Sequence, residues 1–86
     1  MYTIINIYTE SRSLDSVVNK LKRMEEVVDL YEVTGDYDVV AIVRSKNQKD
    51  LREFIKNKML RIEGIKGTNT VVILHVAKRE GKEVED

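Results

Sequence analysis

The feature that most constrains this chain is a pair of runs in which every position is apolar. Residues 39–43 read Val-Val-Ala-Ile-Val, and residues 71–74 read Val-Val-Ile-Leu. Short β-branched runs predict strands, and a strand with one face in water alternates apolar and polar residues. These two strands therefore need cover on both faces. The chain has only 86 residues, so it forms one small domain.

Strand and helix signals alternate along the rest of the chain. Apolar residues recur at helical spacing after Ser13 and after Asn47, each of which is a plausible N-cap. Gly64 is a plausible helix end, and Gly35 with Asp36 a tight hairpin turn. The sequence predicts strands at residues 2–8, 27–34, 37–44 and 68–77, and helices at residues 14–25 and between Asn47 and Gly64.

This order predicts an α+β, ferredoxin-like βαββαβ fold with a four-stranded antiparallel sheet and both helices on one face. The predicted domain spans residues 1–78, and the charged residues 79–86 are expected to be a flexible tail.

A sheet covered by helices on one face leaves its other face exposed. That face would hold roughly five large aliphatic side chains in water, which forgoes ~1.5–3 kcal/mol each. Exposed patches of this kind usually mark interfaces. We therefore expect a homodimer of the dimeric α/β-barrel type, in which the helix-free faces pack together. The interface residues predicted from the apolar runs are Ile5, Val40, Ile42, Val72 and Leu74.

Composition excludes several classes of function. The 15 basic and 15 acidic side chains cancel, so no bulk positive field is available to bind nucleic acid or an anionic membrane. Cysteine is absent, which excludes disulfides and thiolate metal sites. The sequence has no signal peptide and no apolar run of membrane length, so a cytoplasmic protein is expected. High charge content without proline weakly favours a thermophilic source.

Residues that could carry catalysis are few. His75 is the only histidine, and in the last predicted strand it is more often a sheet residue than a base, because a base needs an orienting carboxylate and a pocket. No metal-binding motif or nucleophile elbow is present. The basic residues of the second helix are interrupted by Asp50 and Glu53, which is typical of a solvated face. We therefore expect no catalytic residue, no metal and no cofactor.

Two polar clusters are candidate ligand-binding sites. The first is the turn Gly35, Asp36, Tyr37 and Asp38, whose backbone amides can hold a small anion while a carboxylate holds an ammonium group. An ordinary hairpin turn also explains these residues, since glycine accepts positive φ and aspartate bonds local amides. The second cluster is Thr68, Asn69 and Thr70, which are either plain strand-start residues or polar contacts for a ligand.

Two blocks of the chain resemble the Lrp/AsnC ("feast/famine") transcriptional regulators. Residues 27–40, Val-Val-Asp-Leu-Tyr-Glu-Val-Thr-Gly-Asp-Tyr-Asp-Val-Val, are similar to the second strand, turn and third strand of the family. Residues 64–73, Gly-Ile-Lys-Gly-Thr-Asn-Thr-Val-Val-Ile, are similar to its final strand. The resemblance covers residues 2–77 and points to the family's regulation-of-amino-acid-metabolism (RAM) domain. Because the helix-turn-helix of the family is missing, the chain resembles the stand-alone RAM proteins.

The resemblance implies dimers formed through the sheets, rings that are often octamers, and amino-acid effectors bound between dimers. It implies an effector site at the two polar clusters defined above, with Asp36 and Asp38 on the amino group, the turn amides on the carboxylate and Tyr37 as a wall. Direct contact with DNA is not expected without the helix-turn-helix, and co-assembly with full-length regulators is a further hypothesis that rests on its absence.

Other functions remain open at the level of sequence. The alternative to an amino-acid-sensing module is a small dimeric α/β-barrel enzyme of the monooxygenase or isomerase type, built on His75, Tyr37 or the turn carboxylates. A third possibility is a structural oligomeriser with an empty interface. The chain could also be a piece of a longer regulator, although Met1 directly before the first strand favours a natural start.

Overall fold

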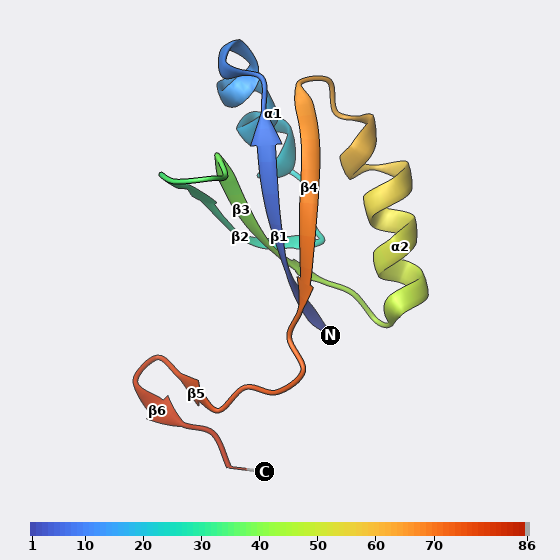
Figure 1. Ribbon diagram of the computed structural model, residues 1–86. Helices are drawn as coiled ribbons and strands as arrows, with labels where there is room; N and C mark the ends of the chain where they lie inside the picture. Colours follow the sequence, from blue (N-terminus) through green and yellow to red (C-terminus); the bar gives the residue numbers. More distant parts are fainter. Residues whose placement is uncertain (86) are drawn as a thin grey trace.

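The computed structural model describes residues 1–85 and confirms the predicted α+β fold (Figure 1). The bounds of the elements, in chain order, are β1 (Tyr2–Thr9), the 3-10 turn η1 (Ser11–Ser13), α1 (Leu14–Leu21), β2 (Val27–Glu32), β3 (Val39–Arg44), α2 (Gln48–Asn57), the 3-10 turn η2 (Met59–Arg61), β4 (Ile65–Val72), β5 (Lys78–Arg79) and β6 (Lys82–Glu83).

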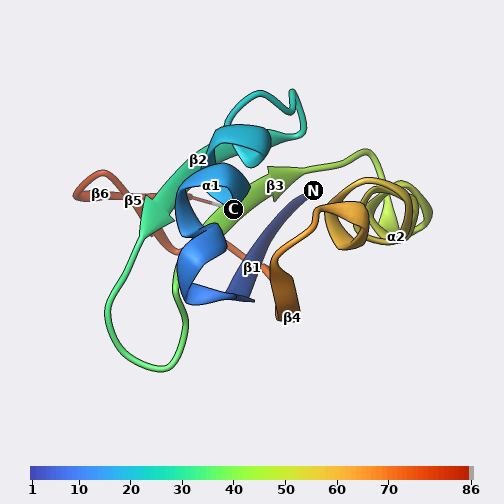
Figure 2. The same ribbon diagram turned by 90° about the horizontal axis from the view of Figure 1, so that it is seen from above.

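The four long strands form one antiparallel sheet in the order β2-β3-β1-β4, and both helices lie on the same side of it (Figure 2). The core lies between the sheet and the helices, because the apolar faces of α1 and α2 point towards the strands. Its buried residues are Ile5, Ile7, Val17, Leu21, Val39, Ala41, Val43, Leu51, Phe54, Met59 and Ile62.

The register of the ladders divides the strand residues between the two faces of the sheet. Cross-strand partners share a face, and the partners of the buried residues Ile5 and Ile7 point towards the helices. The opposite set lies on the helix-free side, which we call the open face. It consists of Tyr2, Ile4, Asn6 and Tyr8 of β1, Asp29 and Tyr31 of β2, Val40, Ile42 and Arg44 of β3, and Gly67, Asn69 and Val71 of β4.

The open face contains only part of the predicted interface. Val40 and Ile42 lie on it. Ile5, in contrast, is completely buried under the helices, and Val72 is paired with Thr3 on the helix-covered face. Leu74 follows the end of β4 and lies outside the sheet. The structure therefore corrects this part of the prediction: β1 is apolar at both Ile4 and Ile5, so its sequence does not reveal which of them faces the helices.

Of the two predicted N-caps, Asn47 makes a capping hydrogen bond and Ser13 does not. Asn47 caps α2, because its side-chain Oδ1 accepts a hydrogen bond of 2.9 Å from the backbone N–H of Asp50. Ser13 occupies the N-cap position of α1, but its side chain makes no capping hydrogen bond. α1 ends at Leu21, earlier than predicted, where backbone turns lead into β2.

The last strand is shifted towards the N-terminus relative to the prediction. The only neighbour of β4 is β1, and the residue opposite Ile73 is Tyr2, where β1 begins. The strand ends at Val72 although its sequence continues apolar. His75 consequently lies in the exposed segment after the strand rather than within it.

A short hairpin forms at residues 78–83, within and just before the predicted tail, whose residue 86 lies outside the described residues. Lys78 pairs with Glu83 and Arg79 with Lys82, around Gly81 at φ +79°. This hairpin extends away from the sheet and helices (Figure 1). None of the helices in the described part of the chain is long and apolar enough to cross a membrane.

Candidate functional site

The turn between β2 and β3 lies at the end of the sheet where β1 finishes and β4 starts (Figure 1). Asp38 fixes it there. Its backbone N–H donates to the Ile7 carbonyl at 3.0 Å, and its carboxylate Oδ2 accepts the Thr9 N–H at 2.8 Å. The carboxylate predicted to bind a ligand amine is therefore already used to hold the turn onto β1.

Gly35 and Asp36 form the outer part of the same turn. Gly35 has a φ of +105°, as the hairpin interpretation of the sequence predicts, and no atom lies near the position of an added Cβ. Asp36 is exposed. Of the two carboxylates in the turn, Asp36 is thus the one that presents its charge to solvent.

Tyr37 packs against Tyr8 on the open face. The two ring centroids are 4.6 Å apart and the ring planes are inclined by 40°. On the other side of Tyr8, β4 contributes Gly67, where a Cβ would come within 3.6 Å of the Tyr8 ring. The turn, β1 and the start of β4 therefore meet at Tyr8. Sequence reasoning missed this residue, because only the register of the sheet brings it between the two predicted clusters.

The pKa of the Tyr8 phenol is raised above its ordinary value of 10.0. A hydrogen bond with Tyr37 is the main cause, burial adds to it, and the nearby negative charges of Tyr37 and Asp36 contribute. Tyr8 therefore stays protonated at neutral pH. The pair presents phenol oxygens that can exchange hydrogen bonds with a polar ligand.

The second predicted cluster is divided between the two faces. Asn69 lies on the open face, where its Oδ1 accepts a hydrogen bond of 3.4 Å from the Asn6 side chain. Thr68 and Thr70 share a face, as their spacing predicts, but it is the helix-covered one, opposite Ile7 and Ile5. Within one chain, Tyr37 of the turn and Gly67 of β4 both lie beside Tyr8. The two threonines lie on the other face of the sheet, away from the turn.

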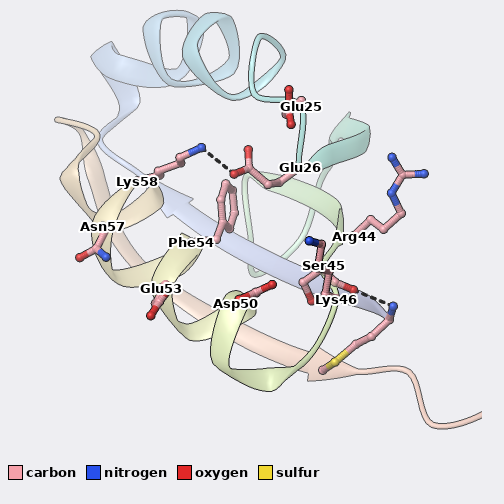
Figure 3. A pocket seen from close by; sticks show the side chains of 11 residues that line it. Glu25, Glu26, Arg44, Ser45, Lys46, Asp50, Glu53, Phe54, Asn57 and Lys58 are labelled. Atoms are coloured by element: carbon pink, nitrogen blue, oxygen red, sulfur yellow. Dashed lines mark hydrogen bonds and ion pairs between the residues drawn. The ribbon is translucent and has the colours of Figure 1, made fainter.

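A separate pocket of about 610 Å³ lies near the start of β1 (Figure 3). None of the predicted ligand-binding residues lines it. Its wall comes from the turn before β2, the end of β3 and one side of α2, and consists of Met1, Glu25, Glu26, Arg44, Ser45, Lys46, Asp50, Glu53, Phe54, Asn57 and Lys58.

An ion pair crosses this pocket. Lys58 Nζ donates to Glu26 Oε2 at 2.6 Å. Burial alone would raise the pKa of Glu26, but the hydrogen bonds and the charge of Lys58 outweigh it, so the pKa lies below its ordinary value of 4.5. Glu26 Oε1 and Ser45 Oγ are also buried here, and no described residue bonds them. The lining of this pocket carries charges of both signs, and the Lys58–Glu26 ion pair links the end of α2 to the turn before β2.

Nothing in the described residues 1–85 resembles a metal centre: no group of three or more histidine or carboxylate side chains is suitably placed. The candidate site is therefore the Tyr8–Tyr37–Gly67 junction together with the exposed part of the turn.

Comparison with known proteins gives a consistent result. The Lrp/AsnC ligand binding domain matches residues 3–83. The chain is 39% identical over 74 residues to the HTH-type transcriptional regulator FL11 of Pyrococcus furiosus, a match that covers 86% of this chain and 48% of that protein. The chain thus spans about half the length of the curated regulators it matches.

Solved structures share the fold. The crystal structure of TTHA0845 from Thermus thermophilus has a TM-score of 0.85 and 26% identity, over 91% of this chain and 98% of that one. The transcriptional regulator NMB0573 of Neisseria meningitidis, solved as a complex with L-Met, has a TM-score of 0.86 over 91% of this chain and 52% of that one. Its identity is 14%, so it shows the fold alone.

Proposed function

The chain belongs to the Lrp/AsnC family, and from that premise we propose that it is a regulator-type effector-binding module that senses amino acids and acts by assembly. The observation that carries the proposal is the position of Tyr8, which packs against Tyr37 and lies beside Gly67 at the rim of an open sheet face. The L-Met complex of the Neisseria regulator, which has the same fold, supports an amino acid as the effector.

The roles of the turn residues follow from their contacts. Asp36 is exposed and attracts the ammonium group of the effector, whereas Asp38 positions the turn through the Thr9 amide. Backbone amides of the turn bind the effector carboxylate, and Tyr37 with Tyr8 forms an aromatic wall. Asn69 lines the β4 side of the pocket, whereas Thr68 and Thr70 point to the other face of the sheet, and a neighbouring copy completes the pocket.

A second copy of the chain covers the open face in this proposal. Ile4, Val40 and Ile42 form the apolar centre of that face, with Tyr31 and Val71 exposed beside them. Dimers then assemble into a ring, an octamer in the form expected from the resemblance, and effectors bind between them. Because a ligand favours the state it binds more tightly, an effector shifts the assembly equilibrium. Co-assembly with full-length regulators would couple that shift to DNA in the cytoplasm.

A non-catalytic role agrees with the relatives, which are named transcriptional regulators. The enzyme alternative relied on His75, Tyr37 or the turn carboxylates, and of these His75 lies in the segment after β4 rather than in the sheet. A turnover assay without added cofactor, with His75→Ala as control, tests this alternative; turnover that depends on His75 would favour the enzyme.

A thermal-shift screen over the twenty amino acids tests the sensor proposal. A ligand at ten times its Kd stabilises the native state by roughly 1.4 kcal/mol, which raises the Tm of a domain of this size by roughly 5–10 °C. We expect at least one amino acid to give such a shift, and Asp36→Asn to abolish it. Asp15→Asn, which removes an exposed carboxylate on α1, is the matched control and should leave the shift unchanged. If no amino acid shifts the Tm of an assembled protein, the module is a plain oligomeriser.

A further inference from the structure

The pocket near the start of β1 contains two buried polar atoms that no group of the described residues 1–85 bonds. They are Oε1 of Glu26 and Oγ of Ser45. Buried polar atoms nearly always have a hydrogen-bond partner, because an unpaired one costs free energy. The pocket has a volume of about 610 Å³, which is within the range of small-molecule sites. It therefore has room for a ligand that supplies the missing partners.

The chemistry of Glu26 selects a hydrogen-bond donor. A carboxylate oxygen only accepts hydrogen bonds, and the other oxygen of this group, Oε2, already accepts one from Lys58 at 2.6 Å. The lowered pKa of Glu26 keeps the carboxylate ionised at neutral pH. An ionised acceptor bonds a charged donor more strongly than a neutral one. The group that completes Glu26 is therefore an ammonium or a guanidinium, and not an anion.

The other cations of the pocket wall do not supply this group. The amino group of Met1 donates to the carbonyl oxygen of Ser45 at 2.8 Å. Arg44 and Lys46 are exposed, and Figure 3 shows the Arg44 side chain pointing away from Phe54. The inner part of the pocket is thus left with an acceptor that a ligand cation can reach.

A second carboxylate lies on the α2 side of the same pocket. Asp50 and Phe54 are four residues apart, so they share one side of α2. In Figure 3 the Phe54 side chain lies between those of Glu26 and Asp50. Phe54 is 4% exposed and gives the pocket an apolar wall, whereas Asp50 is half-buried. This arrangement fits a molecule with a short apolar chain between two cationic ends.

We propose that the pocket binds a small aliphatic diamine. One ammonium group bonds Glu26 Oε1 and Ser45 Oγ, the alkyl chain packs on Phe54, and the other ammonium group faces Asp50. The pocket lies at the start of β1 and the turn between β2 and β3 lies where β1 finishes, so this site is separate from the proposed effector site. A bound diamine joins α2 to the turn before β2 and stabilises the folded domain.

The first test is isothermal titration calorimetry of the unsubstituted protein with 1,4-diaminobutane. We expect saturable binding with a Kd below about 1 mM. 4-Aminobutanoate has the same length but turns a carboxylate towards Asp50, so it should bind at least roughly tenfold more weakly. Tetramethylammonium chloride has no N–H donor and should give no saturable signal. If 1,4-diaminobutane does not bind, or if 4-aminobutanoate binds as tightly, the proposal is overturned.

Two variants that break the same ion pair separate ligand binding from structure. Glu26→Gln removes the carboxylate that bonds the ammonium group, and we expect the Kd of the diamine to rise at least roughly tenfold. Lys58→Met breaks the ion pair as well, but it leaves the carboxylate and removes a competing cation, so the Kd should stay the same or fall. Equal weakening by both variants would contradict the proposal, because it would show that the ion pair only shapes the pocket.

Asp50→Asn tests the second ammonium group without touching the ion pair. We expect the Kd to rise at least roughly threefold, while Asp15→Asn on α1, the matched control, changes it less than about twofold. Circular dichroism checks the folding of every variant. If Asp36→Asn abolishes binding of the diamine and the Glu26 and Asp50 variants retain it, the cation binds at the turn and the pocket proposal is wrong.

Discussion

At the scale of single residues, Gly35 and Gly64 both have a positive φ, but they differ in the space around them. Gly35 (φ +105°) has open space around the position of an added Cβ, whereas a Cβ on Gly64 (φ +100°) would lie 2.3 Å from the Cβ of Ser13. Gly35→Ala is expected to cost roughly 1–2 kcal/mol, which is the backbone term. Gly64→Ala should cost at least ~1 kcal/mol more. Urea unfolding of both variants measures the difference, and equal costs would show that η1 moves aside without penalty.

Asp36 and Asp38 stand close together in the sequence but differ in what they contact. Asp38→Ala leaves the amide of Thr9 without its carboxylate acceptor, and we expect it to lower the free energy of unfolding by about 1–3 kcal/mol. Asp36→Ala, at an exposed position, should stay within about 0.5 kcal/mol of the unsubstituted protein. Unfolding curves recorded without ligand check both values. A large loss of stability in Asp36→Ala would mean that Asp36 also holds the turn.

Residue identity alone predicts part of this site. Glycine and aspartate have turn chemistry that can be recognised in any sequence, so the position of the turn could be predicted. The contact of Tyr8 with Tyr37 and Gly67 depends on the pairing of β1 with β4, for which the sequence has no local signal. The faces of Thr68 and Thr70 depend on the same register, and for this reason the predicted cluster divides in the structure.

At the scale of secondary-structure elements, the Lys58–Glu26 pair joins the end of α2 to the turn before β2. The pKa of Glu26 is lowered and that of Lys58 is raised above its ordinary value of 10.5, chiefly by their hydrogen bond in the case of Lys58. The ion pair therefore contributes its full stabilisation between pH 4.5 and pH 10.5, the ordinary pKa values of the two groups. It is lost as the pH falls through the lowered pKa of Glu26 or rises through the raised pKa of Lys58.

Lys58→Met tests this pair through its pH dependence. We expect the variant to be less stable than the unsubstituted protein at pH 7, with a difference that shrinks as the pH falls below 4.5, the ordinary pKa of Glu26. Lys56→Met removes a charge from the last turn of the same helix and serves as the control. Thermal unfolding from pH 3 to pH 8 is the measurement. A stability difference that does not change over this range would contradict an electrostatic origin.

The order and type of the elements were predictable, since helical spacing, the Asn47 cap and the β-branched runs are local signals. The bounds of β4 were not, because its register against β1 depends on residues far away in the sequence. The hairpin after β4 was not predicted, because its four strand residues are all charged and show no alternation of apolar and polar positions.

At the scale of the whole molecule, the open face decides whether this chain functions alone. The sequence predicted an uncovered apolar face correctly, because the β3 run is apolar at every step. The sequence alone could not show which strand residues lie on that face. The register of the sheet places Ile4 and Val71 there, and it places Ile5 and Val72 on the helix-covered face. We therefore expect Ile42→Lys to weaken association at least roughly 100-fold, since it places two charges in the interface of each dimer.

The most direct test of the account is the molar mass of the unsubstituted chain in sedimentation velocity at micromolar concentration. One chain has a mass of 10.0 kDa. We predict a species of twice that mass or an even multiple of it, with circular dichroism showing a folded protein. A well-folded species of 10.0 kDa at all concentrations would contradict the account, because the open face would then be stable in water and no neighbouring copy would complete the effector pocket.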